Sequence, residues 1–142
     1  MALGNGRSRL NPILDHIHGV GKVYPRGALG VSVAKAGGAW TAGVWVEIIP
    51  AGIVPAQFDI HGITVGAVGN DGEYEISLSS GAGGAEVEIT CEPLVRIAAQ
   101  DVTRKLATMT PLLPAGTRIC AKLNGSTAAL AAGTVKLSYH TY

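Results

Sequence analysis

Apolar and polar residues alternate along most of the chain between Val44 and Tyr142, in short runs that glycine and proline interrupt. The clearest runs are residues 73–79, 85–91, 118–123 and 134–139, where every second side chain is apolar. Side chains of a β-strand point alternately to its two faces, so a period of two predicts strands with one buried and one outward face. Many such strands, at a spacing of roughly 8–12 residues, predict an all-β fold.

Turn-forming sequences separate the expected strands, among them Pro-Ala-Gly at 50–52 and 114–116 and Asn-Gly at 124–125. The expected strands are Lys22–Tyr24, Leu29–Val33, Val44–Ile49, Gln57–Val65, Glu73–Ser79, Ala85–Cys91, Leu94–Ala98, Thr117–Leu123 and Thr134–His140. The apolar phase shifts at Gly62, which predicts a β-bulge or a bend there. Residues 100–107 fit either a short helix or a further strand.

Eight or nine antiparallel strands in about 120 residues suit a jelly roll. We therefore expect an all-β chain whose residues 22–142 form an antiparallel two-sheet β-sandwich of jelly-roll-like topology.

Residues 1–21 differ from this pattern and contain several glycines, Arg7, Arg9 and one brief apolar stretch. The stretch consists of Leu10, Ile13, Leu14 and Ile17, a spacing that suits a short helix after Pro12. We expect an irregular N-terminal arm that becomes ordered against a neighbour, with a disordered tail as the alternative.

Composition changes the picture in one respect. The net charge of +1, with 15% charged residues, creates no field that would draw the chain to nucleic acid or anionic lipid. Mean hydropathy is nevertheless +0.30, and no run approaches the roughly 18–20 apolar residues that span a bilayer. A chain this apolar that does not span a membrane should expose apolar side chains, and we expect partner molecules to cover part of them. Residues 1–9 lack the apolar centre of a secretory signal, which predicts synthesis in the cytosol.

The two cysteines, Cys91 and Cys120, fall in different phases of their strands. Cys91 follows the apolar phase of Val87 and Ile89, whereas Cys120 follows the polar phase of Arg118 and Lys122. The two sulfurs should then point to opposite faces, so we expect two free thiols, as in a reducing compartment.

Histidines offer the first candidate chemistry. His16 and His18 are spaced as on one face of a strand and offer two imidazoles to a metal ion. The next glutamate is Glu47, and we assign no supporting acidic residue near His61 or His140 in the sequence. We therefore expect hydrogen-bonded histidines, no metal site and no cofactor.

Carboxylates gather on the polar phase of two neighbouring strands, at Glu73, Glu75, Glu86 and Glu88. If these strands pair, four like charges crowd one face unless cations such as Arg118, Lys122 and Lys136 answer them. We expect a solvated acidic face, with the carboxylate pair of a glycosidase or a contact patch for a basic partner as the alternatives. Neither a Gly-x-Ser-x-Gly elbow nor a phosphate loop occurs, and basic residues do not interleave with aromatics, so the sequence favours neither an enzyme nor a nucleic-acid binder.

Trp40 and Trp45 are the remaining candidates. Aromatic residues of this kind are enriched at protein interfaces and also stack on sugar rings. We expect an interface or core role, with sugar binding as the alternative.

Short stretches of strand and turn carry a resemblance to a known class. They are 40–47, the Pro-Ala-Gly corner, 58–63, 72–76, 84–89 and 135–140. Together they resemble the small β-sandwich structural proteins of tailed bacteriophages, and the size of the chain is similar to that of the capsid decoration (cement) proteins among them.

This resemblance implies a non-enzymatic virion protein, assembled in the host cytoplasm, that forms a homotrimer and binds the major capsid protein on the outer surface of the head. Its contacts would be the arm residues Arg7, Arg9, Leu10, Ile13, Leu14 and Ile17. One alternative is a tail, baseplate or head-fibre module that binds carbohydrate receptors through Trp40 or Trp45. Another is a cupin-like enzyme that uses His16, His18 and one distant histidine.

Overall fold

A computed structural model describes residues 20–27, 29–66, 68–97 and 103–142. Its strands are β1 (Val20–Tyr24), β2 (Val31–Ala34), β3 (Val46–Ile49), β4 (Phe58–Val65), β5 (Gly72–Ser80), β6 (Val87–Arg96), β7 (Arg104–Ala107), β8 (Ile119–Gly125) and β9 (Ala132–Thr141). Within these ranges, no helix has the length and apolar character needed to cross a membrane.

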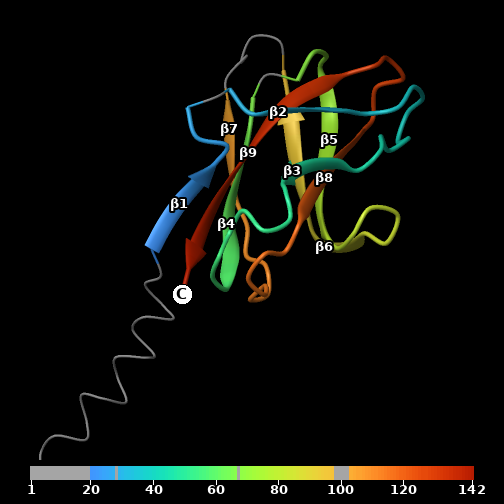
Figure 1. Cartoon of the computed structure of the whole chain (residues 1–142). Helices are drawn as coiled ribbons and strands as arrows, with labels where there is room; N and C mark the ends of the chain where they lie inside the picture. Colours follow the sequence, from blue (N-terminus) through green and yellow to red (C-terminus); the bar gives the residue numbers. More distant parts are fainter. Residues whose placement is uncertain (1–19, 28, 67, 98–102) are drawn as a thin grey trace, which may run out of the picture.

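The strands form two antiparallel sheets (Figure 1). One has the order β1-β9-β4-β7, with β2 also paired to β9, and the other has the order β3-β8-β5-β6. From β2 onward, every connection passes from one sheet to the other except the one between β5 and β6. Without β1, these orders are those of a jelly roll. The prediction of an all-β, two-sheet sandwich is confirmed.

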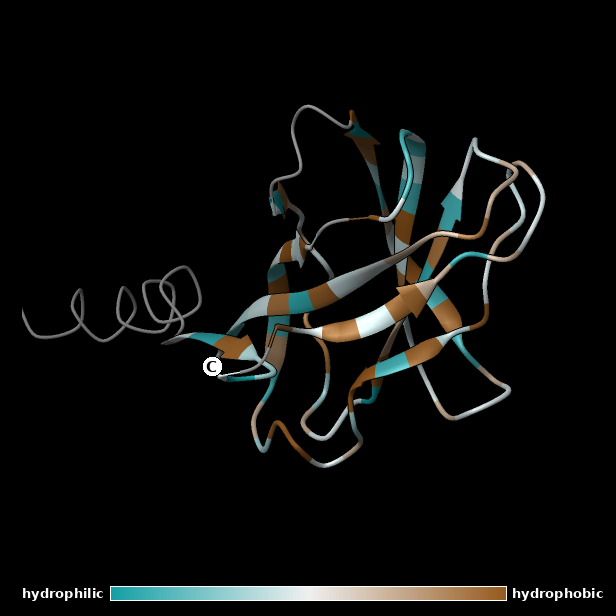
Figure 2. Ribbon diagram, turned by 90° about the horizontal axis from the view of Figure 1, so that it is seen from above, coloured by the Kyte–Doolittle hydropathy of each residue, from teal (hydrophilic) through white to brown (hydrophobic). Residues whose placement is uncertain are grey.

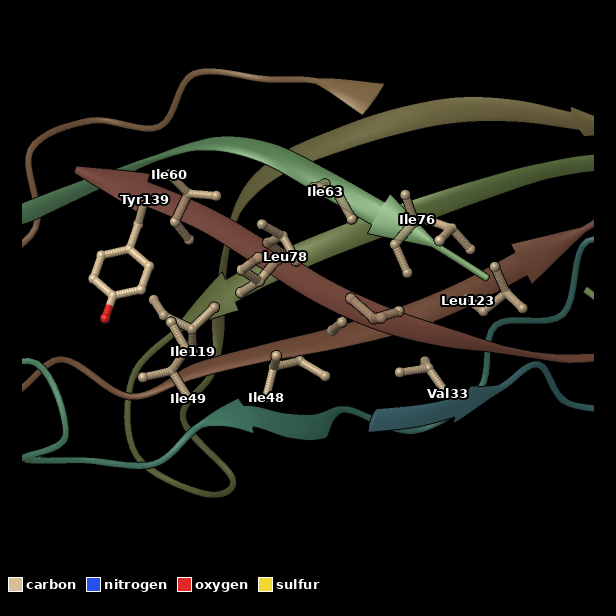
Figure 3. Packing of buried hydrophobic residues seen from close by; sticks show 14 of the residues in the cluster. Val33, Ile48, Ile49, Ile60, Ile63, Ile76, Leu78, Ile119, Leu123 and Tyr139 are labelled. Carbon is tan, nitrogen blue, oxygen red and sulfur yellow. The ribbon is translucent and has the colours of Figure 1, made fainter. Parts of the chain in front are cut away.

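The core lies between the sheets and takes its residues from the inward phase of each strand. Hydrophobic and hydrophilic residues alternate along the strands in Figure 2, and the inward side chains interdigitate in Figure 3. Fully buried members include Ile48, Phe58, Ile60, Ile63, Ile76, Leu78, Ile119, Leu123 and Leu137. Because these side chains fill the space between the sheets, polar groups of the described strands gather on the outer faces and in the loops.

Most predicted strands are found with ends that differ by a few residues. The predicted irregularity at Gly62 is confirmed, since the pairing of β4 with β9 shifts register between Ile60 and Gly62. Residues 104–107 form a strand, which decides the open question there in favour of the strand. The arm predicted for residues 1–21 lies outside the described residues up to residue 19, and β1 begins at Val20.

One prediction about strands is wrong. The two predicted strands 85–91 and 94–98 are not separate, because residues 87–91 and 94–96 belong to the single strand β6, which contains Pro93. A proline inside a strand removes a ladder donor, so it is tolerated on an edge strand, and β6 is the edge of its sheet.

The prediction of two free thiols is confirmed, but the reason for it is wrong. Cys91 is exposed and Cys120 is buried. Cys91 pairs with Ser77 and Cys120 with Ser79, two serines of the same phase of β5, so both cysteines lie on the outer face of one sheet. A register shift between Leu78 and Ser79 separates Cys91 from the phase of Ile89, and β5 lies between the two thiols.

The difference in exposure predicts selective chemistry at the two thiols. Burial raises the pKa of the Cys120 thiol, an effect that the positive charge of Arg118 partly offsets. Because the thiolate is the nucleophile, we expect one thiol per folded chain to react with a disulfide reagent at neutral pH, and two in denaturant. Cys91→Ser should remove the fast reaction, and its persistence in that variant would contradict the assignment. Absorbance of the released chromophore measures the count.

Candidate functional site

Two loops at one end of the sandwich are joined around a buried lysine. The Lys35 side chain is 2% exposed, and its ammonium group donates to the carbonyl oxygens of Ala36, Gly38 and Ala129 at 2.6, 2.9 and 3.3 Å. The backbone N–H of Gly38 also donates to the carbonyl of Ala128. These bonds hold the loop between β2 and β3 against the loop between β8 and β9.

The joined loops carry large apolar side chains on their outer surface. Trp40 is 49% exposed, Val44 77% and Leu130 73%. The backbone at Trp40 has a φ of 54°, in the left-handed region, and its N–H donates to the carbonyl of Gly125 at 2.6 Å. A non-glycine residue in that region is strained and is held there by the surrounding bonds. We call this surface, formed by Trp40, Val44 and Leu130, the Trp40 surface.

Trp45, in contrast, lies half-buried on the outer face of the β3-β8-β5-β6 sheet. The ammonium group of Lys122 lies 4.3 Å from the centre of its ring and 3.4 Å from the Glu88 carboxylate. A cation above a tryptophan face is an attractive contact. Trp45 is thus packed within its own chain, and Trp40 is the more exposed of the two tryptophans.

The acidic face on the same sheet is only partly as predicted. Strands β5 and β6 pair, but Glu73 and Glu75 lie opposite Val95 and Pro93, so the four carboxylates do not face one another. Arg118 pairs with two carboxylates at this face. It donates to Glu86, one of the four, at 3.0 Å and to Glu47 at 2.6 Å. The hydrogen bond from Arg118 is the largest cause of a lowered pKa at Glu86. Of the predicted counterions, Arg118 and Lys122 lie at this face, whereas Lys136 belongs to the other sheet.

A groove lined by both apolar and polar groups runs along the side where both sheets end. Its walls are the edge strands β6 and β7, and its volume is about 370 Å³. Val95 and Ile97 are each more than half exposed there. Edge strands are places where a further strand or loop can add.

A cluster of titratable side chains lies on the outer face of the other sheet, near the C-terminal end of β9. Asp59 Oδ1 and His61 Nε2 are 2.6 Å apart, and the rings of His61 and His140 stack with their centres 4.0 Å apart and tilted by 39°. One ligand atom from each of these three residues lies within 4.8 Å of the others. The Tyr142 hydroxyl donates to the second oxygen of Asp59 at 2.9 Å.

The expectation that no acidic residue lies near His61 in the sequence is therefore wrong, whereas the acidic neighbour of His140 is distant in the sequence. Asp59 and His140 are directly opposite on paired strands, and His61 stands in the irregular part of β4. The signal available in the sequence was Asp59-Ile-His61, since residues two apart on a strand share a face. The part played by His140 could not be predicted from the sequence, because its contact with Asp59 depends on the pairing of segments 81 residues apart.

The remaining candidates lie outside the described residues. They are the predicted arm contacts Arg7, Arg9, Leu10, Ile13, Leu14 and Ile17, together with His16 and His18. Their roles stay predictions from the sequence.

Comparisons with known proteins add a distant likeness. No protein-family model matches the chain, and no curated protein is significantly similar to it. Among solved structures, the chain is similar to one chain in the structure of infectious bursal disease virus, Gx strain, with 12% sequence identity and a TM-score of 0.39. The match covers 86% of this chain and 32% of the other, so this chain spans about a third of the viral chain's length.

Proposed function

We propose that this protein is a structural component of a virus particle, a decoration protein that binds the outer surface of the capsid and stabilises it. The observation that carries the proposal is the Trp40 surface, where the two joined loops expose Val44 and Leu130 by more than 70% each and also carry a strained, hydrogen-bonded tryptophan. Exposed apolar side chains on a fixed backbone favour association, because little conformational freedom is lost when a partner covers them.

The fold is compatible with this role without requiring it. Jelly rolls occur in viral capsid proteins, in lectins and in cupins, so the fold alone does not decide among them. Buried side chains fill the space between the sheets, which supports a role for the outer surface. Surface binding is the whole task of a decoration protein, which needs no catalytic group.

The decoration protein would stabilise the assembled capsid by mass action. A protein that binds an assembled shell but not its separated subunits favours the assembled state by RT ln(1 + [L]/Kd) for each site. We propose that three copies associate, because linked copies bind with a high effective concentration. The N-terminal residues and the Trp40 surface would supply the contacts to the major capsid protein.

The proposal predicts which parts of the chain are needed for binding. The particles used are those made by cells that naturally express the gene, after the native protein has been washed off. We expect the full chain to sediment with the shells, and a variant lacking residues 1–19 to lose binding while remaining folded, since β1 begins at Val20. A Trp40→Ala, Leu130→Ala double variant should weaken binding at least tenfold, by loss of buried apolar area.

Val87→Ala is the matched control, because Val87 is 66% exposed but lies on β6, away from the Trp40 surface. It should bind like the full chain. Unchanged binding by both the truncated and the double variant would overturn the assignment of the contacts. Failure of the full chain to bind any shell would overturn the proposed function.

A tail, baseplate or head-fibre module that binds carbohydrate is a second candidate, favoured by the same exposed Trp40 ring. Sugar rings stack on such aromatic faces. In that case Trp40→Ala should abolish binding to a glycan array, whereas the decoration role predicts no glycan binding by the full chain.

A further inference from the structure

Three buried polar atoms without hydrogen-bond partners converge on the outer face of the β1-β9-β4-β7 sheet. They are Asp59 Oδ1, His61 Nε2 and His140 Nδ1. Buried polar atoms of folded proteins are nearly always paired, because leaving one unpaired costs about 1–3 kcal/mol. Asp59 Oδ1 and His61 Nε2 are close, at 2.6 Å, but they do not have the geometry of a hydrogen bond. A single group that accepts an electron pair from each of the three residues would give all three atoms a bonding partner.

The fold brings these residues together without help from the loops. Asp59 and His140 are cross-strand partners on β4 and β9, so their side chains lie side by side on one face. His61 lies where the register of β4 shifts, and its ring stacks on that of His140. On the far side of β9, His140 pairs with Gly21, which has no side chain to cover the imidazole. Sites built on strands hold their ligands more precisely than sites on loops.

We propose that Asp59, His61 and His140 bind one divalent first-row transition-metal ion. Two imidazoles and one carboxylate are the ligands that Zn²⁺ and its neighbours prefer, whereas Ca²⁺ and Mg²⁺ prefer oxygen ligands alone. Ligand atoms about 2.0–2.1 Å from a tetrahedral ion are about 3.3 Å from one another. The ligand atoms of the three residues lie within 4.8 Å of one another, so small side-chain rotations would bring them to that spacing. Three protein ligands leave a position for water or for a donor from another molecule.

Tyr142 orients the carboxylate of this site. Its hydroxyl donates to Asp59 Oδ2 and leaves Oδ1 for the ion. The backbone N–H of Tyr142 donates to the carbonyl of Gln57, which fixes the last residue beside β4. Hydrogen bonds of this kind to a ligating carboxylate tune metal affinity.

The ion would fasten the end of β9 to β4, beside the start of β1. Because folding brings residue 59 next to residue 140, the site exists in the folded chain, and metal binding should stabilise that state. This role does not depend on the proposed virion function, since it concerns the isolated chain.

Calorimetry with the full chain, free of any affinity tag, tests the proposal. We expect one Zn²⁺ bound per chain, no binding of Ca²⁺, and a Tm that rises with Zn²⁺ and falls again with a chelator. Asp59→Asn, His61→Gln and His140→Gln should each lower the Zn²⁺ affinity by about 100-fold or more, and Tyr142→Phe by about tenfold. Circular dichroism in chelator establishes that each variant is folded.

A His16→Ala, His18→Ala double variant is the matched control, because it removes two imidazoles and leaves the proposed ligands in place. It should bind Zn²⁺ like the full chain. X-ray absorption of the zinc-loaded full chain provides a readout without variants and should show two imidazole nitrogens on the metal. Loss of binding only in the control variant, binding that all ligand variants retain, or no stoichiometric binding would each overturn the proposal.

Discussion

Phe58→Ala should destabilise the folded chain by about 3–5 kcal/mol, the range measured for truncation of large core aromatics. Phe58 is fully buried, and its ring meets that of Tyr139 edge to face with centres 5.8 Å apart. Its backbone exchanges two hydrogen bonds with Leu113, so the surroundings cannot easily collapse into the cavity. Such a loss is a large part of the 5–15 kcal/mol that stabilises a typical domain.

Urea denaturation of the purified variants measures this effect. Phe58→Leu keeps an apolar side chain of similar size and should cost less than about 1.5 kcal/mol. Met109→Ala is the matched control, since Met109 is 76% exposed, and it should stay within about 0.5 kcal/mol. A loss below about 1 kcal/mol for Phe58→Ala would mean that the space between the sheets is less tightly filled than described.

Lys35→Met should cost about 2–3 kcal/mol, although methionine has nearly the same length. The substitution removes the ammonium group that three carbonyls accept from, and hydrogen bonds to a charged donor contribute about 1.5–3 kcal/mol. The two loops that the lysine joins should loosen. We therefore expect faster hydrogen exchange at the N–H groups of Gly38 and Trp40, measured by NMR.

Lys105→Met makes the same chemical change at an exposed position of β7 and should leave stability within about 0.5 kcal/mol. If Lys35→Met proved equally neutral, the buried ammonium would not be what joins the loops. The strained backbone at Trp40 would then need another explanation.

The period-two pattern was sufficient to predict the fold, because the inward phase of the central strands, such as Ile76 and Leu78 of β5 and Ile119 and Leu123 of β8, is apolar. It was insufficient where the chain departs from a regular ladder. On β6 the register shift next to Leu78 moves Cys91 out of the phase of Ile89, so the predicted face of that cysteine was wrong. Such shifts depend on the neighbouring strand, which local alternation does not specify.

The candidate sites could likewise be predicted where the signal lies in neighbouring residues, and not where it depends on which strands pair. Trp40 was identified from its residue type and the glycine-rich loop before it, both local signals. Asp59 and His140 are neighbours only because β4 pairs with β9, and the sequence contains no local sign of that pairing. Lys35 was not singled out at all, since a lysine after a strand is ordinarily exposed.

The central claim is that this sandwich acts by covering the outer surface of a capsid. Electron cryomicroscopy of particles from cells that naturally express the gene tests it most directly, with density into which the sandwich can be fitted. We expect the sandwich at regularly repeated positions over the shell, in groups of three, with the Trp40 surface in contact with the major capsid protein. Density confined to the tail, or particles that lack the protein altogether, would contradict the account.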